Sequence, residues 1–324
     1  MGYFLFVRRF LIYSCIGLLS IFGFIVIIDP YGVTGYNVLN IQNKIIRDNR
    51  IEKNNIFNNS SMDFDNIILG SSRAESLNPL YLSTLVGGHS FNFALGGTDI
   101  DSSIETLYFL DEINKLPKKV LLCIDFTNFI IDKNSKEEQL KFEQNMFESK
   151  KEQVINKIFS IDALRASMKT LKYHVKNELV NSKIDSNGFL IVKQQEIVGD
   201  FEKIQKLTNQ YYYINYRQGN VKISHKQLEK ISLIKDFARD KNIQLFIMLT
   251  PVHENLYSMI QTNIVLNDTL QEFKTKLNMI YPYYDAMILD DTTINNFNFY
   301  DAVHYTETFG NLLLENAVNF YRLH

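Results

Sequence analysis

The chain has 324 residues, enough for one large folded domain or two small ones. Its 34 basic and 36 acidic side chains give a formal net charge of -2, so no overall field favours nucleic acid, and no nucleic-acid partner is expected. Its two cysteines, Cys15 and Cys123, are too few for a disulfide framework or a zinc knuckle, and neither a metal nor another cofactor is expected.

The first predicted element is a transmembrane helix over residues 10–28. This run contains no charged residue and is long enough to cross a hydrocarbon core of roughly 30 Å. Arg8 and Arg9 precede it, so the positive-inside rule places residues 1–9 in the cytoplasm and the rest of the chain outside a bacterial cytoplasmic membrane. A cleaved signal peptide fits less well because no small-x-small cleavage site follows, and a buried core helix is rarely so long and uncharged.

Beyond the span, residues 29–62 are polar, rich in Asn and only weakly periodic, which indicates a stalk. A single domain is predicted over residues 63–324. Its short apolar runs are typical of buried strands, and they lie at Asn66–Leu69, Ser90–Ala94, Lys119–Ile124, Ile243–Leu249 and Tyr284–Leu289.

Helical patterns alternate with these runs, at Asp101–Asn114, His225–Asp240, Leu266–Leu277 and Thr306–Tyr321. The alternation predicts the α/β class: a three-layer α/β/α sandwich, flavodoxin-like, around a central five-stranded parallel sheet. Residues from roughly 133 to 225 interrupt it with Lys- and Glu-rich helical segments, a turn at 186–188 and the tyrosine-rich segment Tyr211–Tyr216. We expect a helical insertion there, whose tyrosines either stack on sugars or pack in the core.

Reactive side chains in such a sheet gather beyond the carboxyl ends of the strands. The first apolar run is followed by Gly70, Ser71, Ser72 and Arg73. A glycine turn leading into a helix would leave a serine hydroxyl near unpaired backbone N–H donors. Ser72 is therefore a candidate nucleophile, and a serine that only caps the helix is the alternative.

The next runs are followed by candidate donors to an oxyanion. Gly96 and Gly97 let the backbone approach a substrate closely, although an ordinary turn explains the pair equally well. Asn128 could donate from its side-chain amide or could close an Asx turn. His253, after the fourth run, is a candidate substrate contact, and an exposed loop position is the alternative.

Asp301 and His304 lie three residues apart, just before the last helical pattern. A carboxylate in this position can hold one imidazole nitrogen so that the other accepts a proton from a serine. The alternative is a helix-capping aspartate beside an unrelated exposed histidine. Because all of these loops follow strands of one parallel sheet, we expect them to converge at one edge.

The order of the motifs, Gly-x-Ser, Asn-x-x-x-x-Gly, Thr-Asn and Asp-x-x-His, resembles that of the SGNH/GDSL hydrolase superfamily. The resemblance covers the domain after the stalk, apart from the insertion. It implies that Ser72 is the nucleophile, His304 the general base and Asp301 the carboxylate that orients it. It further implies an oxyanion hole formed by the Ser72 N–H with Gly97 and Asn128.

Two blocks depart from the usual pattern of that superfamily. Ser71 stands where the first block has Asp, Arg73 stands where it has Leu, and the third block lacks Gly-x-Asn-Asp. With its single anchor and its Thr-Pro-Val-His loop, the chain is most similar to membrane-tethered members related to teichoic-acid D-alanine transfer and alginate-type O-acetylation proteins. Arg73 and His253 are expected to contact the substrate.

The expected function is that of an extracytoplasmic serine-dependent O-acyltransferase or esterase, which acts on cell-envelope polysaccharide through an acyl-enzyme on Ser72. The expected partners are an envelope glycan or acylated polymer, membrane lipid through one helix, and a membrane-bound acyltransferase. One alternative is a non-catalytic envelope-assembly or carbohydrate-binding protein with the same fold. Another is a metal-dependent hydrolase using His253, Asp301 and His304, whose spacing matches no known zinc or iron site.

Overall fold

The structure, a computed structural model, describes residues 2–30, 39, 41, 49–135, 160–176, 182–192, 198–216 and 219–323. The chain divides into two units. One comprises Met1–Asn58 with Glu143–Lys183, and the other comprises Asn59–Phe142 with Ile184–His324. The segment predicted as an insertion therefore contributes to both units.

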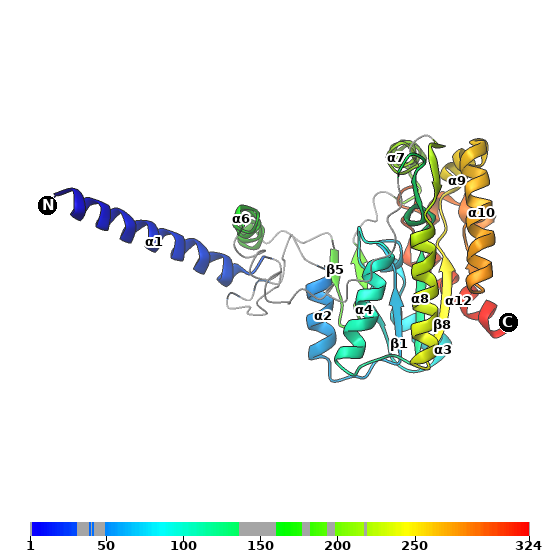
Figure 1. Ribbon diagram of the computed structural model, residues 1–324, viewed down its shortest axis with the longest axis horizontal. Coiled ribbons are helices and arrows are strands. Elements are labelled where there is room, and N and C mark those ends of the chain that lie inside the picture. Colours follow the sequence, from blue (N-terminus) through cyan, green and yellow to red (C-terminus); the bar gives the residue numbers. More distant parts are fainter. Residues whose placement is uncertain are drawn as a thin grey trace. The chain divides into compact units, whose positions relative to one another are not determined.

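Five parallel strands form the central sheet of the second unit, which confirms the predicted fold class (Figure 1). Their order across the sheet is β2 (Ser90–Asn92), β1 (Asn66–Leu69), β3 (Lys119–Ile124), β8 (Gln244–Leu249) and β9 (Tyr284–Asp285). Every residue of β1 is buried, and so is every residue of β3 and β8 after the first. Such nearly continuous burial is typical of a parallel sheet covered on both faces.

Two strands end earlier than their apolar runs. In β9 the side chain of Asp285 accepts a hydrogen bond from the Met287 N–H at 3.0 Å, which turns the chain after two residues although the run continues to Leu289. In β2 the strand ends at Asn92, whose side chain accepts the Ala94 N–H at 2.9 Å. In both places the side chain of the last strand residue accepts a local backbone N–H, which begins the turn.

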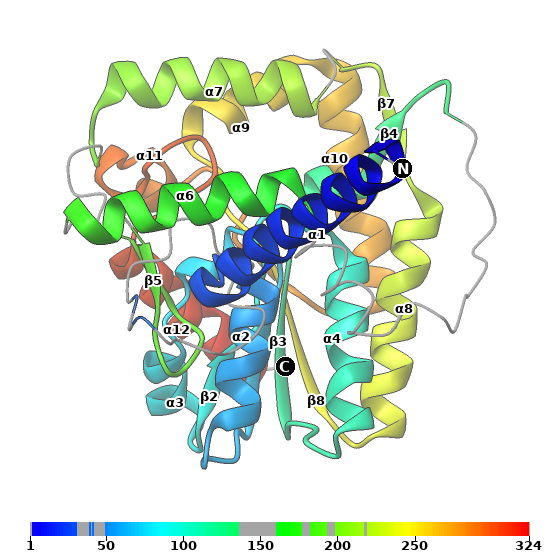
Figure 2. The ribbon, with the colours of Figure 1, turned by 90° about the vertical axis from the view of Figure 1, so that its left-hand side faces the viewer.

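Helices cover the sheet on both faces, which completes the three layers. Figure 2 shows α4 (Ile100–Glu112) and α8 (His225–Asp240) on one side of the strands, and α3 (Pro79–Val86) and α12 (Glu307–Leu323) on the other. The core on the α12 side includes Ile68, Leu121, Met248, Phe309 and Leu313. The described part of the unit also contains α9 (Glu254–Thr262), α10 (Ile264–Ile280), α11 (Asp291–Ile294) and the 3-10 turns η1 (Ala74–Ser76), η2 (Phe126–Phe129) and η4 (Asn296–Asn298).

The helix starts follow the capping residues in the sequence. Asn78 caps α3, where Pro79 takes the first helical position, and Asp99 caps α4. Ser224 caps α8 and Asn263 caps α10. The apolar pattern does not predict α3 or α9, although the Asn78-Pro79 pair is a recognisable start signal for α3.

The described part of the predicted insertion contains strands as well as helices. Its described residues form α6 (Ile161–Lys176) and α7 (Phe201–Asn215), but also β5 (Ser182–Ile184) and β6 (Leu190–Val192), which form a two-stranded sheet around the predicted turn at 186–188. At its borders β4 (Ile130–Asp132) pairs antiparallel with β7 (Val221–Ile223). The Lys- and Glu-rich part over 136–159 lies outside the described residues.

In the first unit, α1 (Gly2–Ile28) contains the predicted span and starts earlier, so Arg8 and Arg9 lie within the helix. It is the one helix among the described residues that is long and apolar enough to cross a membrane. Within the segment predicted as a stalk, the structure forms α2 (Asn49–Asn59), in which the side chains of Lys53 and Phe57 are buried. Its weak apolar periodicity gave no signal for this helix.

Candidate active site

Ser72 lies in the tight turn after β1, where it is free of helix capping. Gly70 has a φ of +149°, and a Cβ there would lie 2.8 Å from the Cys123 carbonyl oxygen, so only glycine lets β3 pass this closely. The following turn, η1, has no side-chain cap. The hydroxyl of Ser72 instead faces a histidine, which removes the capping alternative for this serine.

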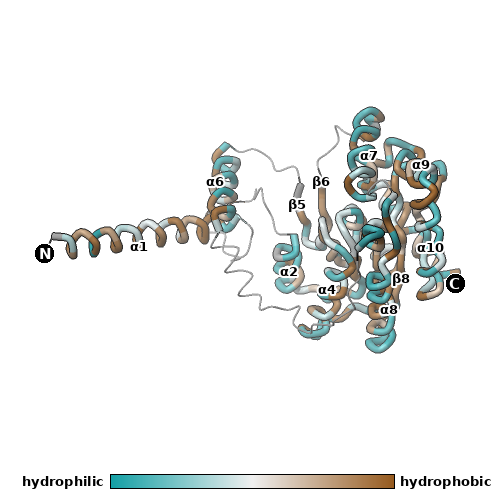
Figure 3. Tube along the Cα trace, turned by 45° about the horizontal axis from the view of Figure 1, so that its top comes forward, coloured by the Kyte–Doolittle hydropathy of each residue, from teal (hydrophilic) through white to brown (hydrophobic). Residues whose placement is uncertain are grey.

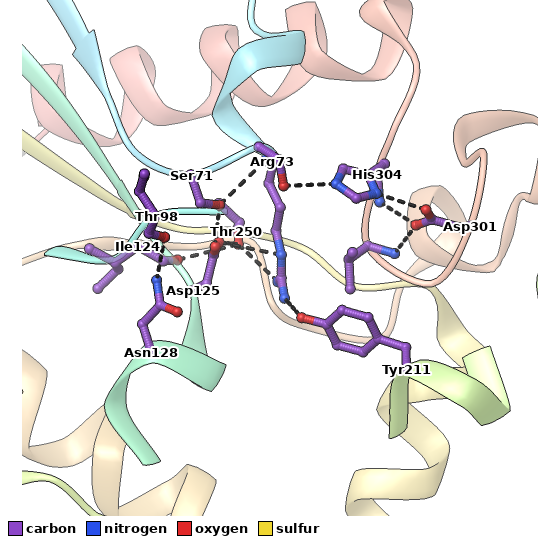
Figure 4. Close-up of polar contacts among 12 residues, drawn as sticks. Ser71, Arg73, Thr98, Ile124, Asp125, Asn128, Tyr211, Thr250, Asp301 and His304 are labelled. Atoms are coloured by element: carbon purple, nitrogen blue, oxygen red, sulfur yellow. Dashed lines mark hydrogen bonds and ion pairs between the residues drawn. The ribbon is translucent and has the colours of Figure 1, made fainter. Parts of the chain in front are cut away.

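The structure brings Ser72, His304 and Asp301 together in one chain of hydrogen bonds. The Oγ of Ser72 lies 2.8 Å from Nε2 of His304. On the other side of the ring, Nδ1 of His304 lies 2.7 Å from Oδ2 of Asp301, and Figure 4 shows these two side chains facing each other. A neutral imidazole that donates from Nδ1 to the carboxylate leaves Nε2 free to accept the serine proton. The geometry therefore fits a nucleophile, a base and an orienting carboxylate.

Asp301 also organises the backbone of its own loop. Its second oxygen, Oδ1, accepts the N–H groups of Val303 and His304, each at 2.8 Å. Burial acts to raise the pKa of Asp301, but the hydrogen bond and the charge of His304 and the two backbone N–H groups outweigh it, so the pKa lies below its ordinary value. The carboxylate thus stays charged at neutral pH.

The lowered pKa predicts how Asp301→Asn changes stability with pH. A depressed pKa contributes stability that is present above the unfolded value of about 3.9 and is lost as the pH falls through the folded value. Oδ1 of Asn can still accept both backbone N–H groups, so the variant removes the charge and the hydrogen bond between Oδ2 and His304. We expect urea unfolding to show a clear stability loss at pH 5 that shrinks toward pH 3. An equal loss at both pH values would contradict the assignment.

His253 has a different role from the expected substrate contact, and it is also not the exposed loop residue of the alternative. Its side chain is fully buried, with Nε2 2.7 Å from Oδ1 of Asn296 and Nδ1 accepting the Asn255 N–H at 3.2 Å. Burial lowers the pKa of His253, which favours the neutral ring. Both nitrogens are thus used within the protein. His253 forms no metal-binding group with Asp301 and His304 among the described residues.

The backbone of His253 instead supports the loop of the candidate base. Its N–H donates to the Ala302 carbonyl at 2.9 Å, and its ring packs edge-on against Phe299 at 5.2 Å between centroids. Across the same loop, the Tyr300 N–H donates to the His304 carbonyl at 2.8 Å. These contacts fix the position of His304 from two sides.

A buried polar network around Asp125 joins the ends of three strands. Asp125 follows β3 and accepts hydrogen bonds from the hydroxyls of Ser71, after β1, and of Thr250, after β8, the latter at 2.5 Å. Its Oδ1 lies 3.4 Å from Nε of Arg73. All four residues are buried. The hydroxyl of Ser71 thus connects the serine turn to a carboxylate on the neighbouring strand.

Arg73 is enclosed by this network and does not present its guanidinium to a substrate, which corrects the expectation from the sequence. Its side chain is 3% exposed; it donates to Thr250 at 3.2 Å and to the hydroxyl of Tyr211 at 2.8 Å (Figure 4). Burial acts to lower the pKa of Arg73, but the Asp125 carboxylate, the two tyrosines Tyr211 and Tyr216 and the hydrogen bond to Tyr211 together outweigh it, so the pKa is raised. Arg73 therefore holds the turn that carries Ser72.

Most tyrosines of the tyrosine-rich segment pack inside the protein, which is one of the two roles expected for them. Tyr212 and Tyr216 are buried, and the Tyr216 ring lies 6.1 Å from that of Phe126. Tyr211 bonds Arg73, as described, and Tyr213 is exposed. Only Tyr213 therefore presents most of its ring to solvent in this segment.

The two candidate oxyanion donors border the site in different ways. A Cβ at Gly96 would lie 3.6 Å from Cβ of Ser72, so the glycine pair passes beside the serine, and Gly97 is exposed with a φ of +72°. Asn128 is partly buried, and its Nδ2 lies 3.5 Å from the Thr98 carbonyl. Ser71 and Asn128 line one small cavity. The oxyanion roles of Gly97 and Asn128 stay predictions.

Sequence reasoning missed Asp125 and Thr250 as site residues. A signal for Asp125 was present: a carboxylate directly after a buried strand, with Arg73 in the turn four residues after another. Buried charges are paired in folded proteins, so two opposite charges at adjacent strand ends predict an ion pair. Thr250 carries no comparable signal.

Comparisons with known proteins leave the chain without an assigned family. No protein family model matches it, and no curated protein matches it. One similar solved structure is a protein from Streptococcus pneumonia provisionally described as a platelet activating factor. It is 12% identical, covers 84% of this chain and 90% of its own, and has a TM-score of 0.37. A likeness this distant carries no argument about function.

Proposed function

We propose that the chain is an SGNH-type serine O-acyltransferase or esterase that acts on cell-envelope polysaccharide. The observation that carries the proposal is the hydrogen-bonded series Ser72, His304 and Asp301, with distances of 2.8 and 2.7 Å between its members. A serine, an imidazole and a carboxylate in this order recur in acyl-transfer enzymes on unrelated folds. The partners here come from opposite ends of the domain, so the arrangement depends on tertiary structure.

In the first half of the proposed reaction, Nε2 of His304 takes the proton of the Ser72 hydroxyl as Oγ attacks the carbonyl carbon of an acyl ester. The tetrahedral intermediate collapses when the bond to the leaving alcohol breaks, and His304 donates the proton to that alcohol. The acyl group then remains on Ser72 as an ester. Asp301 stabilises the imidazolium that forms at each proton transfer.

In the second half, His304 removes the proton from an acceptor hydroxyl, whose oxygen attacks the acyl carbon. The bond to Oγ of Ser72 then breaks, and His304 returns the proton to Oγ, which restores the free enzyme. A sugar hydroxyl as acceptor gives transfer, and water gives hydrolysis. The negative oxygen of both intermediates requires preorganised donors. We assign these to the Ser72 N–H, the Gly97 N–H and the Asn128 amide, because the glycine turn passes beside Ser72 and Asn128 shares a cavity with Ser71.

The length and composition of α1 support the envelope as the place of reaction. A helix that can cross a membrane is consistent with a single-pass anchor. In the proposed topology the N-terminus is cytoplasmic and the catalytic domain is outside, where polysaccharide acceptors and a membrane-bound acyltransferase as acyl donor would be available. A tether raises the local concentration of the enzyme near such a donor.

Pre-steady-state hydrolysis of p-nitrophenyl acetate by the full chain in detergent tests the proposal. We expect a burst of p-nitrophenol close to one equivalent per enzyme, then a slower steady state, because the acyl-enzyme accumulates. A deacetylated envelope glycan that raises the steady rate and becomes acetylated identifies a transferase, and an unchanged rate identifies an esterase. No release above buffer would overturn the proposal and favour the non-catalytic alternative.

A further inference from the structure

One apolar stripe on α6 is partly exposed to solvent. It consists of Ile161, Leu164, Met168, Leu171 and Val175, spaced alternately by three and four residues, so all five share one face of the helix. Ile161, Met168 and Val175 are 71%, 60% and 75% exposed, and Leu164 and Leu171 between them are half-buried. Single exposed apolar residues are common, but three on one helix face, joined by two half-buried leucines, indicate an apolar partner. We call it the α6 stripe.

A different face of α6 is buried within the same unit. Ala163, Ala166, Ser167 and Thr170 occupy that face, and their small side chains allow close packing. The neighbour of α6 in this unit is α1. Figures 1 and 3 both show α6 beside the end of α1 that leads to Ile28. Ile25 and Ile28 are the buried apolar residues of α1 among those described.

This contact places α6 at the depth of the membrane surface. The charge-free part of α1, residues 10–28, rises about 28 Å, close to the thickness of a hydrocarbon core of roughly 30 Å. The Ile28 end of α1 therefore lies at the boundary between the core and the headgroup layer, and α6 packs against that end. If α1 spans a membrane, the lipid surface lies next to α6 and is therefore the partner expected for the α6 stripe.

Basic residues lie directly beside the α6 stripe. Arg165, Lys169, Lys172 and Lys176 are spaced by four, three and four residues, so they form a second row next to the apolar one. Arg165 also pairs with Asp162 at 3.3 Å. An apolar stripe flanked by Lys and Arg is the composition of helices that lie in the plane of an anionic membrane interface.

We propose that α6 lies in the membrane interface, with the α6 stripe against the acyl chains and the basic row against anionic headgroups of the bilayer that α1 crosses. The proposal rests on α1 as a membrane span and is independent of the acyl chemistry. It gives the chain a second membrane contact, formed by residues far from the anchor in sequence.

The absence of tryptophan from the whole sequence allows a clean test. Single tryptophans are introduced in the full chain as Met168→Trp in the stripe, as Lys169→Trp on the adjacent exposed position and as Leu18→Trp in the middle of α1. Each variant is reconstituted in nanodiscs of anionic lipid, with or without bromine on the acyl chains. Bromine quenches only those indoles that reach the chains.

We expect bromolipid to remove roughly half of the emission of Met168→Trp and much less of that of Lys169→Trp, because only the first indole faces the apolar layer. Bromolipid should also quench Leu18→Trp, because this indole lies in the middle of α1.

If bromolipid does not quench Leu18→Trp, α1 does not span the membrane and the proposal for α6 fails as well. If Leu18→Trp is quenched while Met168→Trp is quenched by aqueous iodide instead, the stripe faces water and the proposal alone fails. A Met168→Trp emission that neither quencher reaches would show that protein covers the stripe, which also overturns it.

Discussion

Ser72→Ala is expected to lower kcat/KM for an activated acyl ester by at least about a thousandfold, because the variant removes the atom that becomes acylated. His304→Ala should cost a similar factor, since Oγ of Ser72 loses the base that lies 2.8 Å away. The double variant should be little worse than either single one, because both residues act in the same step. Initial rates of p-nitrophenyl acetate hydrolysis measure all three.

Ser83→Ala provides a matched control. The hydroxyl of Ser83 contacts the Pro79 carbonyl and Ser90, away from the candidate triad. This variant should keep the wild-type rate after equal purification. If the wild type is active and Ser72→Ala retains its rate, the reaction does not proceed through this serine and the proposed mechanism is wrong.

The second large effect is expected on stability, from Arg73→Met. The guanidinium and Asp125 are both buried, and their side chains are 3% and 6% exposed. Removing one partner of a buried pair leaves an uncompensated charge, which typically costs about 3–5 kcal/mol. Urea unfolding should show this loss in the free energy of unfolding. Arg73→Met combined with Asp125→Asn should recover part of it, since no lone charge then remains.

The same variants separate a positioning role from substrate binding by Arg73. If the guanidinium holds the serine turn, Arg73→Met lowers stability and kcat, and Arg73→Lys recovers only part of both because it cannot reach Asp125, Thr250 and Tyr211 together. If Arg73 bound substrate, the variant would raise KM with little loss of stability. That second result would contradict the buried network.

Much of the site could be predicted because parallel strands place their following loops at one edge. The apolar runs identified the five strands of the central sheet, so Ser72 after β1 and His304 near the C-terminus could be expected to meet. Asp301 could be expected beside His304 because the two lie three residues apart. Local pattern and sheet topology were sufficient for these residues.

The rest depends on side-chain contacts that a single sequence does not specify. The sequence predicts substrate contacts for Arg73 and His253, but each is buried because partners distant in sequence bond to it. These partners are Asp125 and Tyr211 for Arg73, and Asn296 for His253. Likewise α2 forms in a polar segment whose pattern predicts no helix. Tertiary packing overrides local propensity at such positions.

The central claim is that the acyl group passes through Ser72, and mass spectrometry of the trapped enzyme tests it most directly. The full chain is mixed briefly with p-nitrophenyl acetate, quenched in acid and digested. We predict one acetyl group on the peptide that contains Ser72. A nucleophile added before the quench should remove this group, and the peptide from Ser72→Ala should not carry it. Acetylation of that peptide to the same extent in Ser72→Ala, or only on residues elsewhere, would contradict it.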